Sequence, residues 1–251
     1  MLALIISTCL LYGLWLIPAK TFRFSQYFAY LAWILHGIIC FNSLFDENGW
    51  KLHIANSVLL VSWLSVMIVF WYKLVSLWVK IPLVFFVWLS LIIIYFNISV
   101  YPVDYKMFSW QLDLHISLSM LAYSIFVVAT LFAISLYTHI KRIKNKPFSV
   151  GSTLIPIVDE ERKLFQLIFL GWLVLTTSLL SGVIFIDDFM QQHLGHKVVF
   201  SILAWLVFGA IVLARLTRGM RGEKLIITSI FGMFFLATGY LGSKIVLEWL
   251  L

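Results

Sequence analysis

Histidine is the residue type of this chain whose chemistry and placement point most directly to a function. Its six copies lie inside apolar segments or in the connections close to their ends: His36, His53, His115, His139, His193 and His196. Neutral imidazole is a common ligand of haem iron and of other transition metals. Two histidines from separate helices are enough to hold an iron porphyrin, with its apolar ring against Leu, Ile and aromatic side chains.

Long apolar segments must position these histidines. Of the 251 residues, 63% are hydrophobic and only 12% are charged, whereas a soluble domain carries about 25% charged residues. This composition excludes a disordered chain, a secreted disulfide scaffold and a cytosolic enzyme. Segments of roughly 20 residues, long enough to cross a bilayer as helices, occupy residues 2–18, 25–45, 54–72, 77–98, 114–139, 164–186, 197–216 and 225–249. We predict an all-α polytopic membrane helix bundle with eight transmembrane helices, forming a single integral membrane domain over residues 1–251.

The charged residues set an orientation for these helices. Fourteen of the 18 Lys and Arg residues accompany the connections after the first, third, fifth and seventh segments. Cytoplasmic loops of membrane proteins are enriched in Lys and Arg, so both termini are expected on the periplasmic side of a bacterial inner membrane. The same distribution accounts for the net charge of +7 without nucleic acid as a partner. Membrane lipid is the partner that it implies.

In this orientation five histidines lie in the outer half of the membrane, and only His139 lies at the inner face. His36 has nine residues between it and the outer end of its segment, or about 14 Å of helix. An ionisable side chain inside a span is costly, which makes it a candidate for function. His36 could instead bond a neighbouring helix through Asn42, Ser43 or a backbone carbonyl. His53, His139 and His193 are interpreted as half-solvated polar residues.

His115 begins a helix face that carries small residues. His115, Ser119 and Ala122 share this face by helical spacing, and small residues allow close approach of a neighbouring helix. We therefore expect His115 to point into the bundle, with His196 at an equivalent depth on another helix. The cofactor-binding candidates are His115, His36 and His196, and the candidate axial ligands of haem iron are His115 and His36.

The inner connection from residue 141 to residue 163 is the longest on the basic side. Its acidic run, Asp159 to Glu161, is expected to cap the following helix, because carboxylates are favourable at a helix N-terminus. This loop is also the candidate docking site for a protein partner.

Four stretches of the chain resemble the cytochrome c assembly family of membrane proteins, which includes the CcsA, HemX and YpjD groups. They are LDLHISLSMLAYSIFVVATLFAISLY (112–137), EERKLFQLIFLGWLVLTTSLLSGVIF (160–185), HKVVFSILAWLVF (196–208) and RGMRGEKLIITSIFGMFFLATGYLGSKIV (218–246). The match covers the C-terminal 140 residues well, and the first four spans by number and placement. Order and spacing together, rather than any single motif, make the resemblance specific.

The resemblance implies haem, or a haem protein, as the partner on the outer side of the membrane. His115 matches the family's histidine at the outer start of its helix, and His36 matches a histidine in the second span of YpjD-like members. Full cytochrome c synthetases carry a tryptophan-rich segment between the sixth and seventh spans. Here that segment reads IDDFMQQHLGHK (186–197) without tryptophan, and Ala214 replaces an expected histidine. The resemblance therefore implies haem binding without synthetase activity, and we do not expect an enzyme.

Two hypotheses follow from the sequence. In the first, the protein binds or handles haem near the outer leaflet through His115, with His36 or His196 as the second ligand. In the second, it is a non-enzymatic accessory or regulatory membrane protein that docks a partner through residues 141–163, and its histidines are structural. A solute transporter is disfavoured, because the spans lack paired broken helices and a midplane carboxylate.

Overall fold

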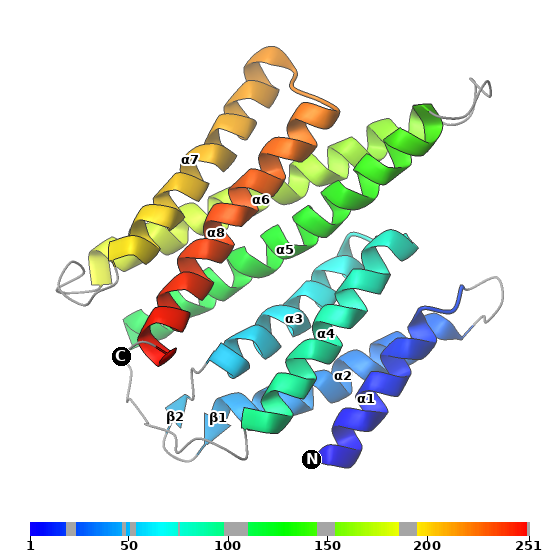
Figure 1. Cartoon of the computed structure of the whole chain (residues 1–251), viewed down its shortest axis with the longest axis vertical. Helices are drawn as coiled ribbons and strands as arrows, with labels where there is room; N and C mark the ends of the chain where they lie inside the picture. The colour runs from blue at the N-terminus through cyan, green and yellow to red at the C-terminus, as the bar shows by residue number, and fades with distance from the viewer. Residues whose placement is uncertain are drawn as a thin grey trace. The chain divides into compact units, whose positions relative to one another are not determined.

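The computed structural model describes residues 1–18, 24–46, 49–50, 54–74, 76–97, 110–144, 154–185 and 195–249. Within these ranges the chain forms eight helices and one two-stranded ladder (Figure 1). The helices are α1 (Leu2–Trp15), α2 (Ser25–Leu44), α3 (Ile54–Trp71), α4 (Leu77–Asn97), α5 (Trp110–Lys144), α6 (Leu154–Phe185), α7 (Gly195–Arg218) and α8 (Glu223–Trp249). The predicted helical architecture is confirmed. The ladder, in which β1 (Phe45–Asp46) pairs antiparallel with β2 (Gly49–Trp50), is the one addition among the described residues.

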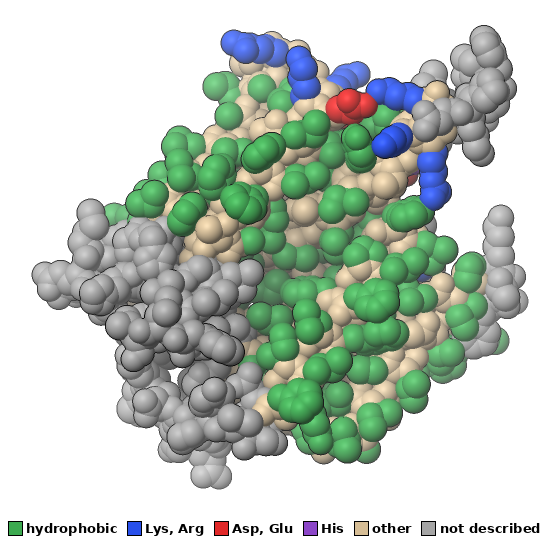
Figure 2. Space-filling model, viewed as in Figure 1, with side chains coloured by type: hydrophobic (Ala, Val, Ile, Leu, Met, Phe, Trp, Pro, Cys, Tyr) green, Lys and Arg blue, Asp and Glu red, His purple; other side chains and the backbone are tan. Residues whose placement is uncertain are grey.

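The helices are built to face lipid. Five of them contain segments long and apolar enough to cross a bilayer: Ser25–Leu44, Leu77–Phe96, Trp110–Lys144, Ile157–Phe185 and Val198–Arg218. Large apolar side chains are exposed, including Leu10 at 66% exposure and Val183 at 71%, and such side chains are spread over the described part of the face in Figure 2. Water would not tolerate such a continuous apolar surface. A membrane protein is therefore confirmed, while the count of eight spans and the periplasmic termini stay predictions.

The contacts of the described residues group into two compact units, residues 1–110 and residues 111–251. Each unit holds four helices, and each has its own apolar core. The two units are described separately below. That they form one integral membrane domain stays a prediction.

In the first unit each helix packs on the next one along the chain, and α4 returns to contact α1. Buried small residues such as Ala29 and Ala32 permit this close approach. Tryptophan indoles also join helices by donating to backbone carbonyls. Trp33 donates to the Trp63 carbonyl at 3.2 Å, and Trp63 donates back at 3.0 Å, with the two rings stacked 4.9 Å apart. This reciprocal pair fixes the register of α2 against α3.

In the second unit α7 packs along α8 and against α6. Phe126 of α5 stacks on Phe208 of α7 with a ring separation of 3.8 Å. Glycine makes room for both rings: a Cβ at Gly171 would lie 2.9 Å from Phe126, and one at Gly232 would lie 2.6 Å from Phe208. The aromatic core therefore requires glycine on the facing helices.

The basic end of the second unit is more helical than the sequence indicated. Residues 141–144 complete α5 and residues 154–163 belong to α6, so only 145–153 of the predicted loop lie outside the described residues. The prediction used apolar residues, which mark only the part of a helix that lies in lipid. Both α5 and α6 extend beyond that part into segments that contain charged residues. The capping interpretation of Asp159 to Glu161 is wrong, because α6 begins at Leu154 and has no acidic residue in its first turn.

Candidate functional site

His115 lies at the interface between α5 and α6, as the small residues on its helix face predicted. Its Nδ1 is 2.9 Å from the backbone carbonyl oxygen of Ser178 and 3.0 Å from the Oγ of Ser181. A carbonyl oxygen can only accept, so Nδ1 carries the proton and donates it. The lone pair of the imidazole is therefore on Nε2. This tautomer, fixed by an Nδ1–H donated to a carbonyl, is the one in which Nε2 can ligate a metal.

A second set of hydrogen bonds holds the same two helices together beside the ring. Ser119 donates to the His115 carbonyl at 2.9 Å, and the Oγ atoms of Ser119 and Ser178 are 2.7 Å apart. Because the Ser119 proton is used, Ser178 donates to Ser119. Ser181 donates to the Ser178 carbonyl at 2.7 Å. Ser178 and Ser181 are only 2% and 6% exposed, so water competes little for these bonds.

Gly182 gives the imidazole its place against α6. A Cβ at this position would lie 2.9 Å from Cε1 of His115 and 3.3 Å from its Nδ1. A real Cβ essentially never lies as close as 2.9 Å to such an atom, so a side chain here requires the ring or α6 to shift. Gly182, Ser178 and Ser181 thus form the surface on which His115 is oriented.

The end of α5 that carries His115 also contains two buried acceptors. Gln111 Oε1 and Asp113 Oδ1 are inaccessible to solvent, and neither has a hydrogen-bond partner in the described part of the chain. Buried acceptors are normally paired with protein or water. Together with the oriented imidazole of His115, they make this end of α5 the candidate site.

His36 has a different environment, at the centre of the first unit. It is completely buried, and both ring nitrogens lie beside protein groups. The Tyr12 hydroxyl of α1 is 3.3 Å from Nδ1, and the Ser62 hydroxyl of α3 is 3.4 Å from Nε2. Ser62 Oγ is in turn 2.8 Å from Ser90 Oγ of α4. One polar side chain from each of the four helices therefore meets in a single hydrogen-bonded chain.

Backbone carbonyls complete this network. Ser90 is 2.8 Å from the Val87 carbonyl and Ser62 is 2.8 Å from the Leu59 carbonyl, and each carbonyl can only accept. Ser62 and Ser90 therefore both have a backbone acceptor in addition to their contact with each other. His36 can ligate a metal only if one of these contacts is broken, so its place in the site stays a prediction that the geometry makes costly.

The remaining histidines are placed to different degrees. His196 lies in the first turn of α7, and its side chain is outside the described residues, so its meeting with His115 stays a prediction. His53 and His193 also lie outside the described residues. His139 pairs with Glu160 at 3.0 Å and is 38% exposed. In the described part of the chain, no three His, Cys, Asp or Glu side chains come together to hold a bare metal ion.

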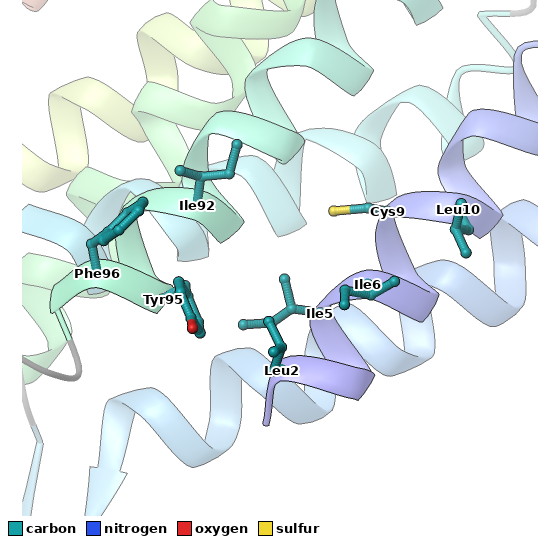
Figure 3. Close-up of a pocket in the computed structure, with 8 residues that line it drawn as sticks. All are labelled: Leu2, Ile5, Ile6, Cys9, Leu10, Ile92, Tyr95 and Phe96. Atoms are coloured by element: carbon teal, nitrogen blue, oxygen red, sulfur yellow. The ribbon is translucent and has the colours of Figure 1, made fainter.

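An apolar groove of about 280 Å³ lies between α1 and α4 in the first unit (Figure 3). Ile5, Ile6 and Cys9 of α1 face Ile92, Tyr95 and Phe96 of α4 across it. No histidine is among its lining residues. The groove suits a hydrocarbon chain. A molecule bound in it would not contact any of the candidate haem-ligating histidines, because none is among its lining residues.

The sequence pointed to His115 but not to the partners that orient it. The signal was present in the small residues Ser178, Ser181 and Gly182 of α6, which are the counterpart of the small-residue face of α5. For His36, the sequence allowed bonding to a neighbouring helix but named other partners. Tyr12, Ser62 and Ser90 come from three other helices, and only their packing brings them to the imidazole.

Comparison with known proteins adds a family to this geometry. A family model described as cytochrome c assembly protein matches residues 24–251. Inner membrane protein YpjD of Escherichia coli is 30% identical over 132 residues, which cover 53% of this chain and 50% of that protein. Cytochrome c biogenesis protein CcsA of Chlamydomonas reinhardtii is 26% identical over 139 residues, covering 55% of this chain and 38% of that protein.

The CcsA protein of Heterosigma akashiwo is 27% identical over 165 residues, covering 52% of this chain and 51% of that protein. The chain thus spans about half the length of the curated relatives it matches. No solved structure matches the chain.

Proposed function

Because the chain belongs to the cytochrome c assembly protein family, we propose that it is a haem-binding protein of cytochrome c biogenesis. Its apolar helices and its similarity to inner membrane proteins make it a multi-pass protein of the inner membrane. In the proposal, haem is held near the outer leaflet and His115 is an axial ligand of its iron.

The orientation of His115 is the observation that carries the proposal. The Ser178 carbonyl accepts the Nδ1–H at 2.9 Å, which sets the tautomer in which Nε2 is the ligating nitrogen. A ring fixed by a neighbouring helix loses little freedom on ligation, which favours binding. Haem supplies the redox-active iron when bound, and the chain's own contribution is to hold the imidazole in the required tautomer and direction.

The second axial ligand is the open part of the proposal. His36 and His196 are the candidates from the sequence. Both nitrogens of His36 are engaged by Tyr12 and Ser62, which supports a structural role and leaves His196 as the stronger candidate. A single histidine ligand is also compatible with haem binding.

We further propose that the protein binds haem without catalysing its attachment. Residues 186–197 contain no tryptophan, although the family's synthetases carry a tryptophan-rich segment there. Handling haem requires a ligand and an apolar surface, both of which this chain offers.

The test is an absorption spectrum of the purified full chain titrated with haem in detergent. We expect a Soret band that shifts and weakens in His115→Ala, and that recovers when imidazole is added to His115→Gly. His139→Ala is the matched control, because His139 pairs with Glu160 at the opposite, basic end of α5. A wild-type chain that binds no haem, or a His115→Ala variant with the wild-type spectrum, would overturn the proposal.

One observation favours a second function, an accessory membrane protein with structural histidines. The complete engagement of His36 is what such a protein would show. Partner docking would then use the predicted segment 141–163, whose residues 141–144 and 154–163 are helical. Replacing 145–153 by a Gly-Ser linker should abolish activity in cells while His115→Ala remains active. The reverse pattern would reject this second function.

A further inference from the structure

Basic side chains gather at one end of the second unit, around the turn between α7 and α8 (Figure 2). The described residues of this end contain nine cations: Lys141, Arg142, Lys144, Arg162, Lys163, Arg215, Arg218, Arg221 and Lys224. They come from all four helices of the unit and from the α7–α8 turn. We call this set the basic collar. It borders the apolar surface of the same helices.

The described carboxylates of this end neutralise only part of the collar, because four of them, Asp159, Glu160, Glu161 and Glu223, face nine cations. Glu223 is 2.6 Å from Lys144, and Asp159 is 4.0 Å from Arg162. Glu160 pairs with His139 at 3.0 Å. In the described part of the chain, no carboxylate lies within ion-pair distance of Arg218 or Arg221. These two arginines and Lys224 are exposed.

The turn that carries these exposed cations is held rigidly against α6. Glu161, only 7% exposed, accepts the Gly222 N–H at 2.9 Å and lies 4.0 Å from Arg215. Arg215 donates to the Met220 carbonyl at 2.6 Å. Gly219 and Gly222 both have positive φ, at +64° and +63°, which permits the tight reversal. The backbone between Arg218 and Lys224 is therefore fixed before anything binds.

We propose that the basic collar is a binding surface for the headgroups of anionic phospholipids, with Arg218, Arg221 and Lys224 as its central contacts. The collar adjoins the apolar surface, so a lipid whose acyl chains lie along α7 and α8 presents its phosphate at this level. Arginine donates to phosphate with a planar fork, and a preordered turn loses little entropy on binding. Glu161 is a positioning residue, because it acts through the Gly222 N–H.

The test titrates dioctanoyl phosphatidylglycerol and dioctanoyl phosphatidylcholine onto the detergent-solubilised chain, with binding followed by thermophoresis. Phosphatidylglycerol should bind more tightly, with an affinity that falls as salt is added. A basic residue near an anionic surface contributes about fivefold. Removing three, in Arg218→Gln/Arg221→Gln/Lys224→Gln, should weaken phosphatidylglycerol binding on the order of 100-fold and leave phosphatidylcholine binding unchanged.

Two controls separate this surface from charge in general. Lys73→Gln removes one cation from the first unit and should leave the affinity unchanged, whereas Arg221→Gln should lower it about fivefold. Arg218→Lys/Arg221→Lys/Lys224→Arg keeps the charges and should retain most of the binding. The proposal is overturned if the triple Gln variant keeps the wild-type preference for phosphatidylglycerol, or if Lys73→Gln weakens binding as much as Arg221→Gln.

Discussion

Replacing Gly182 by alanine is the sharpest perturbation of the candidate haem site, because it leaves His115 itself in place. The added methyl would lie 2.9 Å from Cε1 of the imidazole, so the ring must rotate or α6 must move away. Either response lengthens the hydrogen bond from Nδ1 to the Ser178 carbonyl, now 2.9 Å. The substitution therefore changes the orientation of the candidate ligand without removing it.

The expected magnitudes differ for stability and for ligand binding. Alanine is favoured over glycine in a helix by about 1 kcal/mol, while overpacking costs about 1–3 kcal/mol. Loss of the His115 hydrogen bond adds about 0.6–1.7 kcal/mol in a membrane protein. The net loss of stability should be about 1–3 kcal/mol. Disturbing the group that orients a metal-ligating histidine typically costs 10–100-fold in affinity, so haem binding should suffer more than folding does.

Gly171→Ala is the matched control on the same helix. Its methyl would also meet an aromatic ring at 2.9 Å, but that ring belongs to Phe126. Both variants are titrated with haem by Soret absorbance and unfolded thermally in detergent. Gly182→Ala should lose affinity at a melting temperature similar to that of Gly171→Ala. Equal haem affinity in the two variants would refute the assignment of His115 as a ligand oriented by α6.

Further predictions concern stability and are measured by thermal unfolding in detergent. Tyr12→Phe should cost about 0.6–2 kcal/mol, because it removes only the hydrogen bond to His36. His36→Ala should cost about 2–5 kcal/mol, since it leaves a cavity and unpaired hydroxyls, and its Soret band should persist; a lost band would instead make His36 a ligand. Glu161→Ala should cost about 1–3 kcal/mol, because the part-buried Gly222 N–H loses its charged acceptor, whereas a change under 0.5 kcal/mol would show that the turn is held by other contacts. Gly219→Ala should cost about 1–2 kcal/mol from its positive φ alone, because a Cβ there meets nothing within 4 Å.

The sequence predicted the helices because each lipid-facing segment must satisfy its own backbone and must be apolar over the bilayer thickness. Every predicted segment corresponds to a helix, and the small residues beside His115 correctly predicted a helix contact. An apolar segment does not indicate where its helix ends once the helix has left the bilayer. The continuation of α5 to Lys144 and the start of α6 at Leu154 were missed for that reason.

The hydrogen-bond partners of the buried polar groups could not be predicted from the sequence, because they depend on which helices pack against each other within each unit. Nothing local distinguishes Ser62 from the other serines of α3, yet Ser62 is the one beside Nε2 of His36. Glu161 was assigned to helix capping by its position in the chain, whereas its contact is with the Gly222 N–H, 61 residues away. One sequence cannot reveal such pairs, since each member alone resembles an ordinary surface or core residue.

His36 and His115 differ in the kind of group that contacts Nδ1 of each ring. A neutral imidazole has one donor and one acceptor nitrogen. At His36 both are engaged by hydroxyls from separate helices, so binding iron would leave a buried hydroxyl unpaired at a cost of about 1–3 kcal/mol. At His115 the Ser178 carbonyl accepts the Nδ1–H. Ligation through Nε2 would keep this bond, and for that reason we propose His115 rather than His36 as the iron ligand.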